Sequence, residues 1–271
     1  VREYLRSLIW DGEKRCETLF IDYLGAEDSR YTRTVTRKAL IGAAARILSP
    51  GCKHDHMLVL IGPQGCRKST TLKKLGKEWF SDSLYTMSGK DAYEQLQGFW
   101  IIELSEMAAT RKAEVEQIKQ FVSKQEDNYR AAYARRTQCH PRQCAFFGTT
   151  NDEEFLRDPT GARRFWPVVV TDAGKTLGDK LTASIVDQIW AEAVTYYEAG
   201  ETWYLDGAVE EMARKVQADH TEANGKLGLI ENFLEVLLPE GWDDWDLEKR
   251  LMFWSGGFGE ERNGTVPRTK V

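Results

Sequence analysis

Leu58-Val59-Leu60-Ile61 runs directly into Gly62-Pro63-Gln64-Gly65-Cys66-Arg67-Lys68-Ser69-Thr70, and leucines at helical spacing follow. An apolar strand, a glycine-containing turn and a helix start, in this order, are the context of a phosphate-binding loop. Successive backbone N–H groups of residues 62–70 would surround the phosphates of a nucleotide. Lys68 would bridge the outer phosphates as a catalytic residue, and the Ser69 hydroxyl would bind Mg²⁺. The stretch therefore predicts a P-loop nucleotide hydrolase that uses ATP and Mg²⁺.

One position of this loop departs from the usual pattern. Arg67 stands directly before the lysine, where such loops have glycine. We expect its Cβ atom to crowd the loop and to affect nucleotide affinity. A chance turn of similar sequence is the alternative, which the flanking strand and helix patterns disfavour.

Short apolar runs alternate with amphipathic stretches through the middle of the chain. The runs cover residues 57–61, 84–87, 99–104, 144–149 and 165–170. Strands that alternate with helices indicate an α/β fold with a mostly parallel sheet sandwiched by helices. Helical patterns precede and follow this part. We therefore predict three regions: an N-terminal helical region at 1–50, an ATPase core at 51–172 and a mostly helical C-terminal region at 173–271.

The composition excludes some classes of protein. The chain has 271 residues with a net charge of −5, so it is not basic all over and any nucleic-acid contact must be local. Five cysteines, an odd number, are typical of reduced thiols. No run approaches the ~18 apolar residues that would span a membrane. The chain begins with Val1. We expect a piece of a longer cytoplasmic protein with no membrane partner.

Carboxylates and an amide occur at the ends of two predicted strands. Glu103 lies in the strand at 99–104 and Glu106 follows it. At the carboxyl edge of a parallel sheet, one of them would bind Mg²⁺ and the other would orient or deprotonate the attacking water. We assign Mg²⁺ to Glu103, although the roles are exchangeable. Asn151 would hold that water or the γ-phosphate. Solvated charges and a turn-forming asparagine are the alternatives.

The segment from Asn128 to Arg142 carries positive charge without acidic residues. Arginines alternate with tyrosines in it, which favours binding of single-stranded DNA by phosphate contacts and base stacking. The candidate DNA-binding residues are Arg130, Tyr133, Arg135 and Arg136. A solvated surface loop is the alternative.

Several short motifs occur in a specific order along most of the chain. They are Trp10-Asp11-Gly12, Pro50-Gly51-Cys52, Gly65…Lys68-Ser69-Thr70, Glu78-Trp79-Phe80, Gly89-Lys90-Asp91, Glu103…Glu106, Tyr129-Arg130…Tyr133…Arg135-Arg136, Gly148-Thr149-Thr150-Asn151, Asp158-Pro159-Thr160-Gly161-Ala162-Arg163-Arg164-Phe165-Trp166-Pro167 and Trp203-Tyr204-Leu205. With them the chain resembles the virulence-associated protein E family of phages and mobile islands. That family is similar to superfamily-3 helicases and AAA+ ATPases. The C-terminal hundred residues match it only loosely.

The resemblance implies a ring of six subunits that hydrolyses ATP and acts on DNA in phage or mobile-element replication. A primase domain or another replication protein is the implied partner. Superfamily-3 helicases have a DNA-contacting hairpin where the basic segment falls. Ring ATPases have an arginine finger at the position of Arg163 or Arg164, which reaches the γ-phosphate of the neighbouring subunit. Ordinary ion pairs are the alternative for these two arginines.

Two functions are compatible with these features. The first is an ATP-driven DNA translocase or helicase. The alternative is an ATP-dependent switch that binds DNA or a replication protein without unwinding the duplex. A small-molecule kinase explains neither the basic segment nor the paired arginines.

Overall fold

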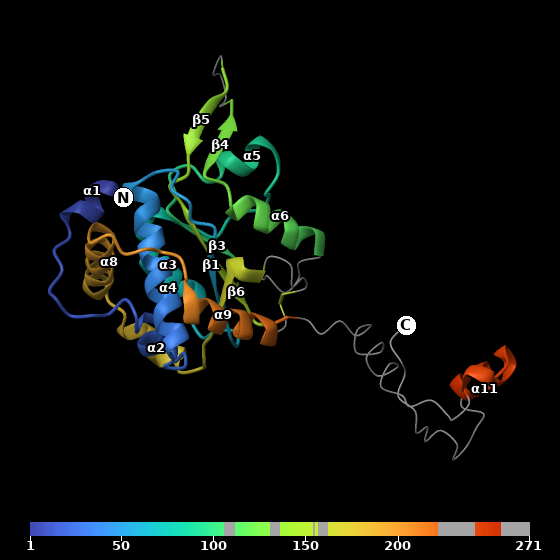
Figure 1. Ribbon diagram of the computed structural model, residues 1–271. Coiled ribbons are helices and arrows are strands. Elements are labelled where there is room, and N and C mark those ends of the chain that lie inside the picture. Colours follow the sequence, from blue (N-terminus) through green and yellow to red (C-terminus); the bar gives the residue numbers. More distant parts are fainter. Residues whose placement is uncertain (106–111, 131–135, 154, 157–161, 222–241, 256–271) are drawn as a thin grey trace. The chain divides into compact units, whose positions relative to one another are not determined.

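Five parallel strands form the central sheet of the computed structural model (Figure 1). The structure describes residues 1–105, 112–130, 136–153, 155–156, 162–221 and 242–255. The sheet order is β2-β3-β6-β1-β7, so the strands are not neighbours in chain order. Their bounds are β1 Met57–Ile61, β2 Phe80–Ser81, β3 Ile101–Leu104, β6 Ala145–Thr150 and β7 Phe165–Val169. The predicted α/β fold with a parallel sheet is confirmed.

One predicted strand is wrong. The apolar run 84–87 is not a strand; the edge strand β2 lies earlier, at Phe80–Ser81. Leu84 and Met87 are instead half-buried against the core on one face of the sheet. A four-residue apolar run does not identify a strand by periodicity alone, because a loop that packs on the core needs the same side chains.

Helices surround this sheet. They are α1 Arg2–Ser7, α2 Leu19–Leu24, α3 Arg30–Leu48, α4 Lys68–Gly76, α5 Gly89–Glu94, α6 Lys112–Val122, α7 Gly174–Leu177, α8 Ala183–Glu198 and α9 Gly207–Asp219, with short 3₁₀ turns η1 Lys77–Trp79, η3 Ala162–Arg164 and η4 Gly178–Lys180. Among the described helices, none combines the length and apolarity that a bilayer crossing requires.

Alternate residues of β1 pack into two separate cores, as the two-residue period of a strand requires. Leu58 and Leu60 belong to the larger core, with buried side chains of α3, α4 and α8. Met57, Val59 and Ile61 belong to the other, with Ile118 and Phe121 of α6. All five residues of β1 are buried, so both faces of the sheet are covered. A site on this sheet must therefore lie at an edge.

Two tryptophans fix α3, α4 and α8 to one another. The Trp100 ring is 4.2 Å from the Trp190 ring, centroid to centroid. Trp100 Nε1 donates to Ala43 O of α3 at 2.8 Å, and Trp190 Nε1 donates to Leu75 O of α4 at 3.0 Å. Both buried N–H groups are therefore satisfied. These contacts position α4, whose first residue is Lys68.

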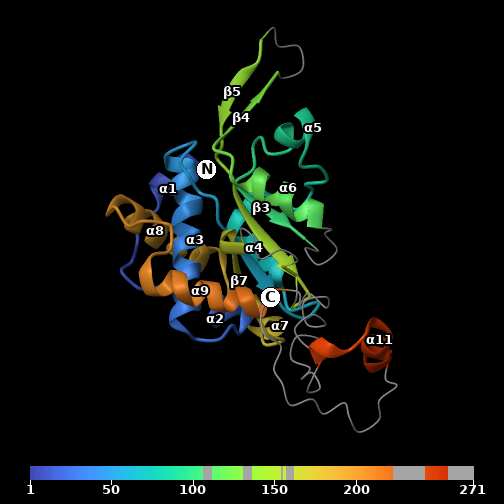
Figure 2. The same cartoon turned by 45° about the vertical axis from the view of Figure 1, so that its right-hand side comes forward.

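An antiparallel hairpin projects beside the sheet (Figures 1 and 2). It consists of β4 Glu126–Tyr129 and β5 Gln138–Pro141. Arg142 fixes its base: the guanidinium Nε and NH2 donate to the two Asp127 oxygens at 2.8 and 2.9 Å, and both side chains are buried. The Tyr129 and His140 rings stack 4.4 Å apart. Charge-assisted bidentate bonding at a buried site gives the hairpin a fixed attachment.

Contacts divide the chain into two compact units, Val1–Glu222 and Ala223–Val271. In the second, η5 Trp242–Asp244 and α11 Leu247–Ser255 are described, and the Trp242 ring lies 5.3 Å from that of Phe253. The boundaries expected at residues 50 and 172 both fall inside the first unit. The division into three regions stays a prediction.

Candidate phosphate-binding site

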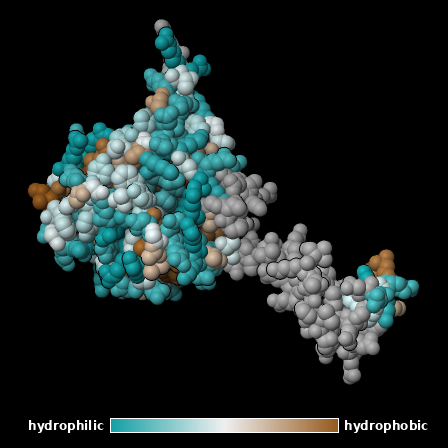
Figure 3. Space-filling model, viewed as in Figure 1, coloured by the Kyte–Doolittle hydropathy of each residue, from teal (hydrophilic) through white to brown (hydrophobic). Residues whose placement is uncertain are grey.

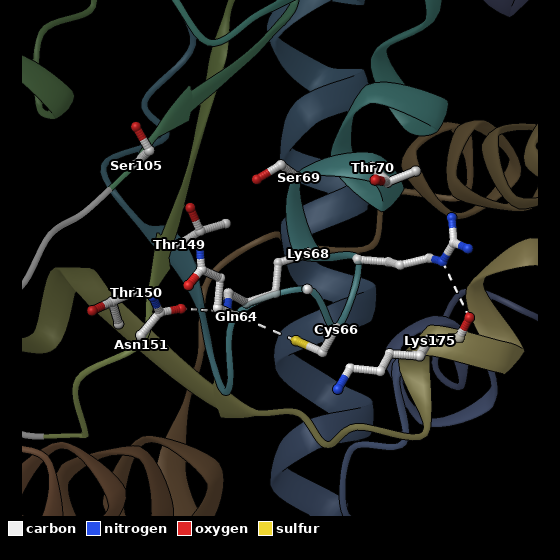
Figure 4. A pocket seen from close by; sticks show the side chains of 12 residues that line it. Gln64, Cys66, Lys68, Ser69, Thr70, Ser105, Thr149, Thr150, Asn151 and Lys175 are labelled. Atoms are coloured by element: carbon white, nitrogen blue, oxygen red, sulfur yellow. Dashed lines mark hydrogen bonds between the residues drawn. The ribbon is translucent and has the colours of Figure 1, made fainter.

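The loop between β1 and α4 forms one wall of a cavity of about 490 Å³ (Figure 4). The cavity is lined by Gln64, Gly65, Cys66, Arg67, Lys68, Ser69, Thr70, Ser105, Thr149, Thr150, Asn151 and Lys175. It lies where β1, β3 and β6 end, at the carboxyl edge of the parallel sheet. Ligands of open α/β sheets bind at this edge. Gly62 begins the loop, and a Cβ atom there would lie 2.5 Å from Val170 O, so only glycine fits.

Arg67 has the backbone conformation that explains the usual glycine at its position. Its φ is +69° and its ψ is 25°, in the left-handed region. A non-glycine residue adopts this region at a cost of roughly 1–2 kcal/mol. The side chain leaves the loop: Nε donates to Lys175 O at 3.2 Å and NH2 pairs with Asp179 Oδ2 at 2.9 Å. The cost of this arginine is therefore backbone strain, and its side chain is bonded away from Lys68.

The Lys68 ammonium lies inside the loop. Its Nζ atom donates to Gly62 O at 2.5 Å, to Pro63 O at 3.0 Å and to Asn151 Oδ1 at 2.9 Å. An ammonium has three N–H donors, and these three oxygen acceptors match that number, with Cys66 Sγ as a further, weaker acceptor at 3.7 Å. The lysine thus connects the loop to the end of β6, which places Asn151 beside it as its position after a strand predicts.

Glu103 accepts hydrogen bonds from two sides with one oxygen. Ser69 Oγ and Thr149 Oγ1 each donate to Oε1 at 2.6 Å. The side chain is only 2% exposed, and Oε2 has no hydrogen-bond partner within the described part of the chain. A buried carboxylate oxygen is costly unless a donor or a cation satisfies it. Ser69 and Glu103 therefore provide adjacent oxygen ligands of the kind that Mg²⁺ takes, and the residues fit this ion.

The other predicted site residues lie elsewhere. Arg163 and Arg164 are in η3, just before β7, and Arg164 Nε donates to Ser123 Oγ at 2.8 Å. Arg130 and Arg136 are exposed, next to the described ends of the hairpin strands. Glu106, Tyr133 and Arg135 fall outside the described residues. The roles assigned to all of these residues stay predictions.

Four lining residues, Ser105, Thr149, Thr150 and Lys175, were not identified from the sequence as site residues. Thr149 shares Glu103 Oε1 with Ser69, and its place next to Asn151 at a strand end was a usable signal. Lys175 lines the opposite wall from α7, and no motif surrounds it. The pairing of β7 with β1, over one hundred residues away in sequence, brings α7 beside the loop.

Solved structures give a distant likeness. Three structures of the NrS-1 C-terminal region in apo form align with TM-scores of 0.47, 0.48 and 0.48, at 16%, 14% and 17% identity. The alignments cover 93%, 93% and 95% of this chain, but only 59%, 64% and 61% of the chains in those structures. The chain thus spans less than two thirds of these structures. No curated protein sequence gives a significant match.

The family comparison covers most of the chain. The model of the virulence-associated protein E-like domain matches residues 5–222, which include every described element of the sheet and of the candidate site. This chain belongs to the virulence-associated protein E-like domain family.

Proposed function

We propose that this chain is a P-loop ATPase that couples ATP hydrolysis to movement on DNA in phage or mobile-element replication. One observation carries the proposal: Lys68 and Ser69 of the loop meet Glu103 and Asn151, which are 34 or more residues away in sequence, at the carboxyl edge of the sheet. A cation, a hydroxyl, a carboxylate and a polar group that positions water recur in enzymes that transfer a phosphoryl group to water.

In this proposal Lys68 exchanges the Gly62 and Pro63 carbonyls for the outer phosphates of ATP. The N–H groups at the start of α4 point toward the same phosphates, and the helix dipole favours their charge. Ser69 and Glu103 hold Mg²⁺, which neutralises charge on the phosphates when bound. Asn151, already in contact with Lys68 Nζ, orients the attacking water or the γ-phosphate. Glu106 orients or deprotonates this water, and the roles of Glu103 and Glu106 are exchangeable.

The position of η3 supports a finger that acts on another subunit. β1 and β7 are parallel, with Met57 beside Phe165 and Ile61 beside Val169. Arg163 and Arg164 precede Phe165, while the loop follows Ile61, so they lie at opposite ends of these strands. The four steps from Phe165 to Val169 span about 13 Å. The paired arginines are therefore remote from their own Lys68, and a head-to-tail ring would bring them to a neighbour's.

The β4–β5 hairpin supports a DNA contact. It is rigidly attached through Asp127 and Arg142, and Figure 3 shows that its surface is largely hydrophilic in this view. Arg130 and Arg136 are exposed next to its two strands, where cationic side chains can bind phosphates.

The test is ATP hydrolysis measured with and without single-stranded DNA, followed by strand displacement on a forked duplex. Hydrolysis that single-stranded DNA stimulates, together with displacement, supports the translocase. Hydrolysis without displacement would support the switch. Absence of hydrolysis under both conditions, from a folded protein that contains residues 1–271, would contradict the proposal.

A further inference from the structure

The first turn of α7 packs directly against the loop. Gly174 opens this helix, and a Cβ atom on it would lie 2.4 Å from Cys66 O. Arg67 adds two bonds, to Lys175 O and to Asp179 of η4. The backbone of α7 is therefore held at a fixed position beside residues 65–67, although these segments are over one hundred residues apart.

Lys175 extends from this turn into the same cavity as Lys68. A Cβ atom on Gly65 would lie 3.9 Å from Lys175 Cε, so the aliphatic chain runs beside the loop. The ammonium pairs with Asp172 Oδ1 at 2.9 Å, and the two side chains are 53% and 62% exposed. An exposed pair of this kind contributes only about 0–1 kcal/mol, so a phosphate can replace Asp172 as partner.

The cavity has two chemically different ends. Thr149 of β6 and Asn151, which follows β6, line the cavity on one side of Lys68, and Thr149 donates there to Glu103 of β3. Lys175 lies on the other side of Lys68, near Cys66, as Figure 4 shows, and its Cε atom is close to Gly65. If the outer phosphate lies at the end with the carboxylate and the amide, the phosphate next to the nucleoside lies toward Lys175.

We propose that Lys175 binds the inner phosphates of the nucleotide, at the end of the cavity away from hydrolysis. This rests on the proposed function, since it assumes that the cavity binds ATP. Lys175 contributes equally to ATP and ADP, because both carry the phosphates that it contacts. Arg67 is the residue that fixes Lys175, through its bond to the Lys175 carbonyl.

The test measures the dissociation constants of ATP and ADP by calorimetry for the whole chain. Lys175→Met is compared with Lys180→Met, which removes the same charge from an exposed position nearby in η4. Loss of a charge-assisted phosphate bond should weaken binding of both nucleotides about tenfold in Lys175→Met and leave Lys180→Met unchanged. Lys175→Arg should restore most of the affinity, because arginine also binds phosphate.

Two results would overturn the inference. Equal affinities for Lys175→Met and Lys180→Met would show that Lys175 makes no contact with the nucleotide. A loss confined to ATP would place Lys175 at the γ-phosphate instead. Failure of the unmodified chain to bind either nucleotide would instead contradict the proposed function itself, so the two failures are distinguishable.

Discussion

At the scale of single residues, the carboxylate of Glu103 is the group of the site whose hydrogen bonding most favours a bound cation. One oxygen accepts from Ser69 and Thr149, and the other is buried without a partner in the described part of the chain. Such a group gains most from a cation, because a cation satisfies the oxygen that the protein leaves unpaired. Lys68 differs in this respect, because its ammonium is surrounded by three oxygen acceptors and by Cys66 Sγ.

Glu103→Gln should separate nucleotide binding from hydrolysis. The amide keeps the size of the side chain but removes the charge that holds Mg²⁺, so we expect turnover to fall by about 10²–10³ while ATP still binds. Steady-state hydrolysis and calorimetry on the same preparation measure both quantities. Glu198→Gln, an exposed position at the end of α8, is the matched control. A Glu103→Gln protein with unchanged turnover would remove Glu103 from the metal site.

At the scale of elements, the contact between α3 and the segment before β1 depends on a buried histidine. A Cβ atom on Gly42 of α3 would lie 2.4 Å from the His54 ring, so only glycine fits beneath it. Burial lowers the pKa of His54 well below its usual 6.5, and the charges of Arg46 and His56 add to this effect. Burial also lowers the pKa of His56. Burial therefore disfavours the protonated form of both rings in the folded protein.

This contact predicts a pH dependence of stability. Below pH 6.5 His54 binds a proton in the unfolded chain, but it binds one much more weakly in the folded protein. The free energy of unfolding therefore falls with falling pH. We expect the decline to begin near that pH in urea titrations. In His54→Gln the decline should be shallower, and His56, whose pKa burial also lowers, contributes to the part that remains. If the free energy of unfolding of this variant has the same slope against pH as the unmodified protein, His54 does not cause the decline. The loss of packing lowers the stability of the variant equally at every pH, so it does not change the slope.

The hairpin is the element on which the DNA contact depends. Replacing Arg130 and Arg136 with alanine should weaken single-strand binding about equally for all sequences, because phosphates carry no base information. The slope of log K against log salt should become shallower by roughly 0.7 for each phosphate that the protein no longer neutralises. Fluorescence anisotropy at several salt concentrations measures both. The control is the double variant Arg6→Ala with Arg30→Ala, at exposed positions of α1 and α3. It removes the same charge and should leave the slope unchanged. An unchanged slope in the hairpin variant would move the DNA site elsewhere.

At the scale of the whole molecule, the sequence predicts those parts of the fold and of the candidate site that depend on residues close together in the chain. Leu58–Thr70 is identifiable because a strand, a loop and a helix follow one another within thirteen residues. Asn151 beside Lys68 follows from the rule that parallel strands end at one edge. Lys175 could not be predicted, because its place depends on which strand β7 pairs with. The strand predicted at 84–87 was wrong because core-packed loops are apolar too.

Assembly can be tested by mixing two inactive proteins. If Arg163 or Arg164 acts on the neighbour's nucleotide, the finger variant should still bind ATP but hydrolyse it about 10³-fold more slowly. Mixed with Lys68→Ala protein it should regain partial activity, because some interfaces unite an intact loop with an intact finger. Lys68→Ala mixed with Glu103→Gln is the control, since no subunit then has both groups. If neither mixture regains ATP hydrolysis, and the activity per subunit does not depend on protein concentration, the active site is not shared between two subunits.

The most direct measurement for the account as a whole is the ATP hydrolysis rate of Lys68→Ala beside that of Lys73→Ala. Both remove one lysine from α4, but only Lys68 lines the cavity, and Lys73 is exposed. The account predicts that Lys68→Ala abolishes hydrolysis, because no other group replaces the cation at the transferring phosphoryl group, and that Lys73→Ala matches the unmodified protein. Hydrolysis by Lys68→Ala at the unmodified rate would contradict the assignment of the nucleotide site.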